Sequence, residues 1–463
     1  MKIPLMKGDK IDANVDYRDA LPVNMIAVNR EILGAKGYML SYPGISAHGD
    51  GVGPDRGGMY NDKLGILFRV SGEKLIRVSA QGAVTELGDI PGFSQVAMPS
   101  SFNTQAIIAD GKMFLYGSGL VQVTDADIGS PIDGTWIDGY YFLTDGEYLY
   151  HTELLDETAI NPLSYATAEF MPDACLGVGK TQDNKVIAFG RYTIEYFVNV
   201  ATENFAFKRV EGRAMKIGIV ATHAKCEVAG VWYIVGGRKE EALGVHVIGT
   251  GEASKISTRE IDKILSGYTE AELLDIRVEA RKEDGTTFII INLPYETICF
   301  NKEIADVFGK EYAWTMLQTG LLSNVYSGIN CVLDPRSGKF ILGSRTSAEI
   351  GYLDNTTFTQ FGEIQEAVIF SPFVNLETMS VDELSIETIP GRNTIDDAAV
   401  FVSISRRGDV LGKEYTMAYG EPLDYQQRFI MRRLGYIGSW VGFKFRAATK
   451  SRLSFASFDV VAT

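Results

Sequence analysis

Apolar and polar residues alternate in short stretches along most of the chain, and tight turns separate these stretches. In residues 140–153, for example, the alternation runs on both sides of Asp145-Gly146. Such alternation is typical of strands with one buried face, and Asp-Gly favours the tight turn of a two-residue hairpin. The pattern predicts an antiparallel hairpin, followed by a polar, proline-marked link over residues 154–173.

Similar hairpins recur at an irregular spacing that averages about 45 residues, the period of propeller blades. Their turns are expected at Asn61-Asp62, Asp110-Gly111, Asp138-Gly139, Asp183-Asn184, Ala229-Gly230, Asp284-Gly285 and Ser337-Gly338. A small antiparallel sheet cannot bury both faces by itself, so such units stack around an axis. The repeat predicts an all-β fold with a β-propeller, seven blades being favoured and six possible. A set of unrelated hairpins in β-sandwiches is the alternative.

The strand pattern changes near residue 365. Residues 365–463 contain longer alternating strands, which predict a β-sandwich-like domain of about a hundred residues. Residues 60–364 are assigned to the propeller. Residues 1–59 are interpreted as an N-terminal arm and connector that leads into the ring, and their glycine-rich part, residues 51–58, as a flexible connector.

Helical periodicity is clear in one segment, residues 254–275. Ser257 with Glu260 and Thr269 with Glu272 have the spacing of capping boxes, and apolar residues between them recur every three or four positions. The segment predicts a short two-helix connection packed on a sheet edge. A docking helix for a partner is the alternative.

The chain carries a formal net charge of −15. This charge argues against a protein that binds nucleic acid by neutralising phosphates, but it allows a surface that DNA merely passes. No run of eighteen apolar residues occurs, and the N-terminus becomes polar too early for a signal peptide. Folding in a cytoplasm, without membrane insertion, is therefore expected.

The C-terminal end is basic, in contrast to the whole chain. Its basic residues are Arg432, Arg433, Lys444, Arg446, Lys450 and Arg452. Strand alternation places Phe443 and Phe445 on one face, and Lys444 and Arg446 on the other. The basic positions are interpreted as a solvated sheet face, with an electrostatic contact to an acidic neighbour as the alternative.

Residues that could carry chemistry are scattered. The cysteines, expected to be reduced thiols, are Cys175, Cys226, Cys299 and Cys331. The histidines, on different units and without metal-pair spacing, are His48, His151, His223 and His246. The sequence contains neither a phosphate-binding loop nor a nucleophile elbow. No catalytic residue, cofactor or metal site is therefore predicted. A glycan-binding or hydrolytic propeller is kept as the alternative function.

Several segments, in order along nearly the whole chain, resemble a known family. They include Asp16-Tyr17, residues 21–25 (LPVNM), Gly37-Tyr38 and residues 41–45 (SYPGI) near the N-terminus. Further matches are YTIEYF at 192–197, the helical segment 248–273, LQTGL at 317–321, FSPFV at 370–374 and residues 432–451. The chain thereby resembles the tail hub proteins of short-tailed lambdoid phages, also called packaged DNA stabilisation proteins or tail accessory factors.

The resemblance implies a structural virion protein that is not an enzyme. Such proteins form a ring, expected to have six copies, beneath the portal and its head-to-tail adaptor ring. The ring closes the head after packaging, stabilises the packaged DNA, forms the ejection conduit, and carries the tailspikes and tail needle. The protein would then be assembled in the host bacterial cytoplasm and reside in the virion tail, with DNA passing through the channel without sequence-specific binding.

Overall fold

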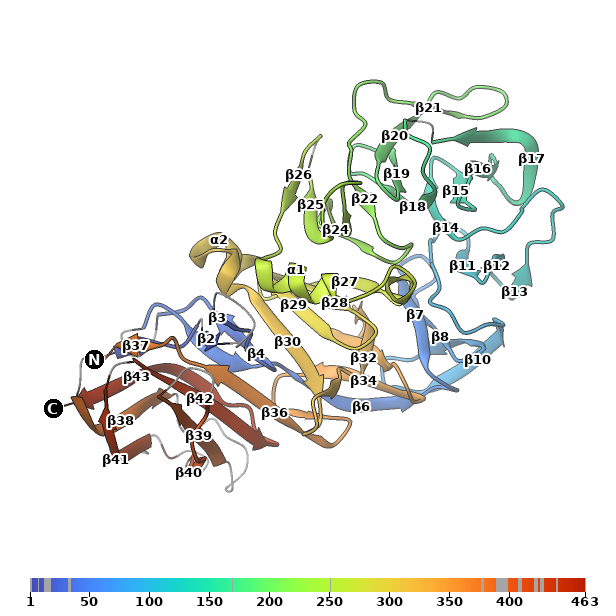
Figure 1. The fold of residues 1–463 in the computed structure, drawn as a ribbon. Coiled ribbons are helices and arrows are strands. Elements are labelled where there is room, and N and C mark those ends of the chain that lie inside the picture. Colours follow the sequence, from blue (N-terminus) through green and yellow to red (C-terminus); the bar gives the residue numbers. More distant parts are fainter. Residues whose placement is uncertain are drawn as a thin grey trace.

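Seven sheets stand around a common axis in the computed structural model, and a two-layered sandwich packs beside them (Figure 1). The seventh sheet continues through the short strand β35 (Thr359–Gln360) into one layer of the sandwich. The structure describes residues 2–6, 8–11, 18–31, 35–168, 170–249, 251–375, 379–388, 399–406, 410–419, 424, 429–438 and 440–462. Within these residues the seven sheets form a propeller, which confirms the predicted all-β fold and the favoured blade number. The Asp16-Tyr17 part of the N-terminal motif lies outside the described residues.

The first four blades follow one another along the chain. Blade 1 contains β7 (Asp55–Asn61), β8 (Ile66–Ser71), β9 (Lys74–Val78) and β10 (Val84–Asp89). Blade 2 contains β11 (Gln105–Ala109), β12 (Lys112–Tyr116) and β13 (Leu120–Gln122). Blade 3 contains β14 (Asp133–Ile137), β15 (Tyr140–Thr144), β16 (Tyr148–Glu153) and β17 (Asp156–Thr167). Blade 4 contains β18 (Cys175–Lys180), β19 (Val186–Gly190), β20 (Ile194–Asn199) and β21 (Phe207–Arg209).

The last three blades include one strand from the N-terminal part of the chain. Blade 5 contains β22 (Gly218–Ile219), β23 (Lys225–Val228), β24 (Val231–Gly237), β25 (Gly244–Ile248) and β26 (Ala253–Lys255). Blade 6 contains β27 (Arg277–Glu283), β28 (Thr286–Asn292), β29 (Thr297–Asn301), β30 (Trp314–Thr319) and β31 (Asn324–Val325). Blade 7 contains β32 (Gly328–Asp334), β33 (Lys339–Ser344), β34 (Glu349–Asp354) and β6 (Gly44–Asp50).

The tight turns lie where the sequence predicts them. Asp110 and Gly111 both have positive φ, 45° and 75°, as the type I′ turn between β11 and β12 requires. The predicted polar link over residues 154–173 is wrong in its first part. Residues 156–167 form β17, the fourth strand of blade 3. Register shifts opposite Thr152 let this strand accommodate its irregular, polar sequence.

Strand β6 closes the ring. It pairs antiparallel with β34 as the outer strand of blade 7, and the chain then enters blade 1 at β7. The glycine-rich residues 51–58 are thus only partly a connector, since Asp55 to Gly58 already belong to β7. The additional Cβ of a side chain at Gly57 would lie 2.6 Å from a side-chain carbon of Val96, so close packing explains this glycine.

The predicted two-helix connection is present as α1 (Arg259–Ser266) and the 3₁₀ turn η1 (Glu272–Asp275). The Thr269–Glu272 capping box forms, with the Thr269 amide donating to Glu272 at 2.9 Å. The prediction of a Ser257–Glu260 capping box is wrong, because Thr258 is the N-cap and the Ser257 hydroxyl donates to Asp262. A further helix, α2 (Lys302–Phe308), and a 3₁₀ turn, η2 (Lys310–Tyr312), were not predicted.

The sandwich consists of two sheets. One contains β36 (Glu363–Phe370), β37 (Val374–Asn375), β39 (Ala399–Ser405), β40 (Tyr415–Ala418) and β42 (Trp440–Thr449). The other contains β1 (Lys2–Pro4), β4 (Met25–Val28), β5 (Tyr38–Ser41), β38 (Met379–Thr388), β41 (Phe429–Ile437) and β43 (Ser454–Ala462). Strand β35 (Thr359–Gln360) pairs with β36 and with β6, so the first of these sheets is continuous with blade 7. The remaining short strands are β2 (Gly8–Ile11) and β3 (Arg18–Ala20), which pair with each other.

The N-terminal segment contributes strands to both domains. Strands β1, β4 and β5 lie in the sandwich, and β6 lies in the propeller. Between them, Val23 bridges to Met316 of β30 and to Val368 of β36. The segment therefore ties the two domains together, while the predicted division into 1–59, 60–364 and 365–463 stays a prediction.

Candidate functional site

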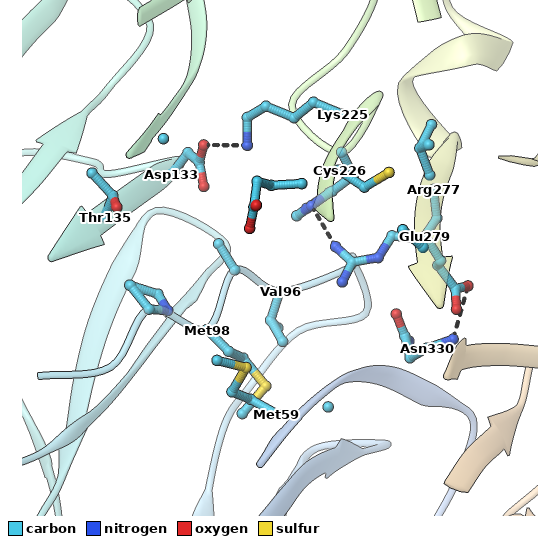
Figure 2. A pocket seen from close by; sticks show the side chains of 18 of the residues that line it. Met59, Val96, Met98, Asp133, Thr135, Lys225, Cys226, Arg277, Glu279 and Asn330 are labelled. Carbon is cyan, nitrogen blue, oxygen red and sulfur yellow. Dashed lines mark hydrogen bonds and ion pairs between the residues drawn. The ribbon is translucent and has the colours of Figure 1, made fainter. Parts of the chain in front are cut away.

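A polar cavity of about 560 Å³ lies on the propeller axis. The inner strands of the blades surround it, among them β7, β14, β18, β23, β27 and β32. Figure 2 shows Asp133, Lys225, Arg277, Glu279 and Asn330 gathered there from four strands, β14, β23, β27 and β32. Propellers commonly carry their functional groups in such a position, so this cavity is the first candidate for a site.

An ion pair crosses the cavity wall between blades 3 and 5. Lys225 Nζ lies 2.7 Å from Asp133 Oδ2, and both side chains are nearly buried, with 10% and 4% exposed. The same carboxylate oxygen accepts a hydrogen bond from the backbone amide of Val178 at 2.8 Å. Asp133 therefore connects strands of three blades, which is a structural use of a buried charge.

A second chain of contacts joins blade 6 to the segment before blade 2. Arg277 Nη1 lies 2.9 Å from His223 Nδ1, and His223 Nε2 lies 3.2 Å from the carbonyl oxygen of Gln95. Since the guanidinium can only donate, Nδ1 accepts and Nε2 carries the proton. Burial lowers the pKa of His223 well below its usual value, and the neighbouring cations Arg277 and Lys225 add to this effect. The imidazole is thus a neutral linker.

Glu279 holds blade 6 against blade 7. Its carboxylate accepts the backbone amides of Asn330 at 2.9 Å and Cys331 at 2.6 Å, and the side-chain amide of Asn292 at 2.6 Å. The Asn330 amide in turn donates to Asp55 Oδ1 at 2.8 Å. These hydrogen bonds satisfy the buried charge and fix the register of adjacent blades.

Asp55 completes the axial network through a buried pair with Arg69. Arg69 Nε lies 2.7 Å from Asp55 Oδ2, and the Arg69 side chain is fully buried. Burial raises the pKa of Asp55, and the guanidinium opposes that rise. Each of these charged side chains takes part in contacts that join one blade to another. The residues around the cavity therefore hold the blades together, as expected of a structural element and not of a reaction centre.

The thiols and imidazoles add no reactive pair. Burial raises the pKa of Cys331 to about 12 and also raises that of Cys226, so both thiols at the axis stay protonated. Among the described residues, no three His, Cys, Asp or Glu side chains gather as metal ligands. The cysteines in the described structure are free. The expectation of no catalytic, cofactor or metal site stays a prediction.

Sequence reasoning missed the axial residues as a group. The available signal was a charged residue in an inner strand, such as Asp133 before Gly134 and Glu279 within β27. Which of these charges meet depends on the ring closing, so the pairs could not be deduced from spacing.

The predicted alternation in the C-terminal strand is confirmed. Phe443 and Phe445 are each 2% exposed and lie in the sandwich core, whereas Arg446 faces outward. Arg446 pairs with Glu366 at 3.1 Å and Glu414 at 2.7 Å, on β36 and next to β40. This part of the basic end is therefore neutralised within its own sheet.

Comparisons with known proteins identify the family of this chain over nearly its whole length. Residues 1–358 match the family model described as "Bacteriophage P22 Gp10, beta-propeller", and residues 366–463 match "Bacteriophage P22 Gp10, beta-sandwich". The "Tail hub protein gp10" of Salmonella phage P22 is 30% identical over 479 residues, covering 99% of this chain and 98% of the relative.

Two solved structures overlay on this chain more loosely. The Neurospora crassa Pan2 WD40 domain overlays with a TM-score of 0.43 at 8% identity, covering 69% of this chain and 98% of that one. Virginiamycin B lyase from Staphylococcus aureus overlays with a TM-score of 0.42 at 12% identity, covering 65% and 94%. Such distant overlays say nothing about function. The end-to-end family matches do, and the chain belongs to the Gp10 family of phage tail hub proteins, which are structural proteins of the virion tail and not enzymes.

Proposed function

We propose that six copies of this chain form a ring beneath the portal and its head-to-tail adaptor. The ring closes the channel after packaging, stabilises the packaged DNA, and later serves as the ejection conduit. It also carries the tailspikes and the tail needle, and it assembles in the host cytoplasm. The observation that carries this proposal is the match of both domains, in order and over 99% of the chain, to a tail hub protein.

The axial cavity supports a structural role for each propeller, because its lining joins the blades to one another. Its volume of about 560 Å³ is far too small for a DNA duplex, and its wall is crossed by contacts such as Asp133–Lys225. DNA would therefore pass through the centre of the ring, between copies, and not along the axis of one propeller. The net charge of −15 supports passage without sequence-specific binding.

Attachment by protein contacts alone is part of the proposal. In the part of the chain that the structure describes, none of the helices is long and apolar enough to span a bilayer. The alternative of a hydrolytic propeller is excluded by the family, and no specific observation favours a glycan-binding one.

The proposal is tested with particles assembled without this chain. We expect heads that fill with DNA and then lose it, and that bind neither tailspikes nor needle. Adding the purified chain to freshly filled heads should restore DNA retention and spike attachment. Stable, spiked particles in its absence would contradict the proposal.

A further inference from the structure

Most of the net negative charge of this protein comes from two neighbouring blades. Residues 97–167, which include blades 2 and 3, contain ten acidic residues and one basic residue, Lys112, or −9 of the chain's −15. The acidic residues are Asp110, Asp125, Asp127, Asp133, Asp138, Asp145, Glu147, Glu153, Asp156 and Glu157. Such segregation creates a local field that the average composition conceals.

Part of this charge is already used inside the chain. Asp133 pairs with Lys225, and Asp110 pairs with Arg56 at 3.2 Å. Other acids lie at one end of blade 3, beside a cavity of about 240 Å³ that is lined by Asp127, Asp145 and tyrosines.

Apolar side chains are exposed beside these acids. Leu163 and Tyr165 of the outer strand β17 are 61% and 54% exposed, and Tyr165 lines the same cavity. We call Asp127, Asp145, Glu147, Leu163 and Tyr165 the acidic face. Apolar side chains surrounded by charges of one sign are the composition expected of a protein contact.

The opposite composition occurs in the sandwich. Residues 428–452 contain seven Lys or Arg and no Asp or Glu. Within this stretch Arg432 and Arg433 of β41 are exposed, although Arg432 also lies 3.2 Å from Glu383. Arg406, next to β39, donates to the carbonyl of Leu434 at 2.6 Å, which places it beside β41.

The hairpin connection before β40 extends this basic area. Lys413 is exposed, and with Arg406 and Tyr415 it lines a hollow of about 310 Å³. Tyr415 is 45% exposed, and Tyr436 on β41 is 62% exposed. We call Arg406, Lys413, Arg432, Arg433, Tyr415 and Tyr436 the basic edge.

The two surfaces lie at opposite ends of the molecule. In Figure 1, β16 and β17 are far from β40 and β41, with the rest of the propeller and the sandwich between them. The acidic face therefore cannot reach the basic edge of its own chain. A complementary pair of patches at the two ends of one protomer is the arrangement that gives head-to-tail contacts, which close into a ring when the rotation between copies allows it.

We propose that the acidic face of one copy binds the basic edge of the next copy. The occupant of each surface is thus a second copy of this chain. The inference rests on the proposed ring and deepens it by naming the surfaces that join the copies. Because the contact brings exposed charges together over distances within a Debye length, salt should weaken it.

Charge reversal on each side provides the test, with sedimentation velocity of the full chain at low salt as the measurement. The acidic-face variant carries Asp127→Lys and Glu147→Lys, and the basic-edge variant carries Lys413→Glu and Arg433→Glu. We expect either variant alone to associate about tenfold more weakly, or worse, than the unaltered chain. In a mixture of the two variants every contact pairs opposite charges again, so the mixture should assemble although neither variant does.

A matched control variant changes the net charge by the same amount as the acidic-face variant, but at a different surface. Glu240→Lys with Glu252→Lys alters exposed positions of blade 5, and association should stay within about twofold of the unaltered chain. The proposal is overturned if the control weakens assembly as much as the acidic-face variant, or if the mixture of folded variants stays dissociated. It is also overturned if the unaltered chain remains monomeric at low salt. None of these results alters the particle assay of the proposed function, so the two can fail separately.

Discussion

The side-chain amide of Asn24 donates a hydrogen bond of 2.8 Å to the backbone carbonyl of Glu366. It donates a second one of 3.0 Å to the carbonyl of Gln318, so that one buried side chain joins β36 of the sandwich to β30 of blade 6. Asn24 has a φ of 53°, a left-handed conformation that asparagine tolerates better than most residues. A single residue of the N-terminal segment therefore connects the two domains.

Replacing Asn24 by Ala should destabilise this connection. Two carbonyls lose their donor and the left-handed backbone becomes less favourable, so the free energy of unfolding should fall by about 2–4 kcal/mol. Denaturant unfolding measures the loss, and limited proteolysis should release the sandwich earlier. Asn24→Gly keeps the backbone conformation accessible and isolates the hydrogen-bond contribution. Asn29→Ala, at an exposed side-chain contact with Glu303, is the control and should cost under about 0.5 kcal/mol.

The buried Asp133–Lys225 pair should behave as a brace between blades. Lys225→Met leaves the carboxylate without its cation, and we expect a loss of about 3–5 kcal/mol in unfolding free energy. Combining it with Asp133→Asn should recover most of that loss. Lys185→Met, which breaks a more exposed pair with Asp183, should cost less than about 1 kcal/mol. Equal losses in the two single variants would contradict a bracing role for the axial pair.

Stability should fall as pH decreases from 7.5 to 5.5. Burial is the main reason why the pKa values of four histidines lie below their usual value. These are His48, His151, His223 and His246. In the unfolded chain these imidazoles titrate near their usual value of 6.5, so the unfolded state binds more protons below that pH and folding is disfavoured. Urea midpoints at the two pH values test this. His223→Gln should reduce the difference, and a midpoint that rises on acidification would contradict the prediction.

The turns of this protein could be predicted from sequence because their geometry is local. Asp284 and Gly285 have φ values of 48° and 82°, and residues that accept such values mark the turn directly. The interpretation of residues 154–173 as a link failed for a related reason. Strand β17 is held by pairing with β16 across a bulge, and its own sequence, with Asn161-Pro162, argues against a strand.

The axial site could not be predicted because its contacts cross blades that are distant in sequence. Asp133 meets Lys225, and Glu279 meets Asn330, only when their blades stack around the common axis. Helix α2 was missed because it is one short segment that begins directly after β29, with Asn301 as its N-cap. The axial contacts thus depend on tertiary context, whereas the helix is too short to show a clear helical period.

The helical segment between blades 5 and 6 should act as an exposed brace. Glu270 pairs with Arg191, which lies in the turn between β19 and β20 of blade 4, and Glu272 completes the capping box with Thr269. Because Glu270 is exposed and Glu272 is only half-buried, Glu270→Lys with Glu272→Lys should leave the chain folded and cost about 1–2 kcal/mol. Circular dichroism and thermal unfolding check this. Complete unfolding in solution would instead show that the segment is part of the propeller core.

The wall of the proposed DNA channel should not bind the duplex. A wall rich in Lys or Arg would bind phosphates with counterion release, and tight binding would slow ejection. With a net charge of −15, the isolated chain should repel a duplex over about one Debye length, roughly 8 Å at physiological salt. We therefore expect no detectable duplex binding in a fluorescence anisotropy titration at that salt.

Retention of DNA in the particle would then depend on a mechanical plug, for which the needle at the tip of the ring is the proposed part. Particles that contain the ring but lack the needle should leak DNA, whereas needle-bearing particles should not. Submicromolar binding by the isolated chain, with a steep decrease in affinity as salt rises, would show instead that basic side chains hold the duplex. Within the sandwich, Arg446 offers no such site, because its guanidinium is already paired with Glu366 and Glu414.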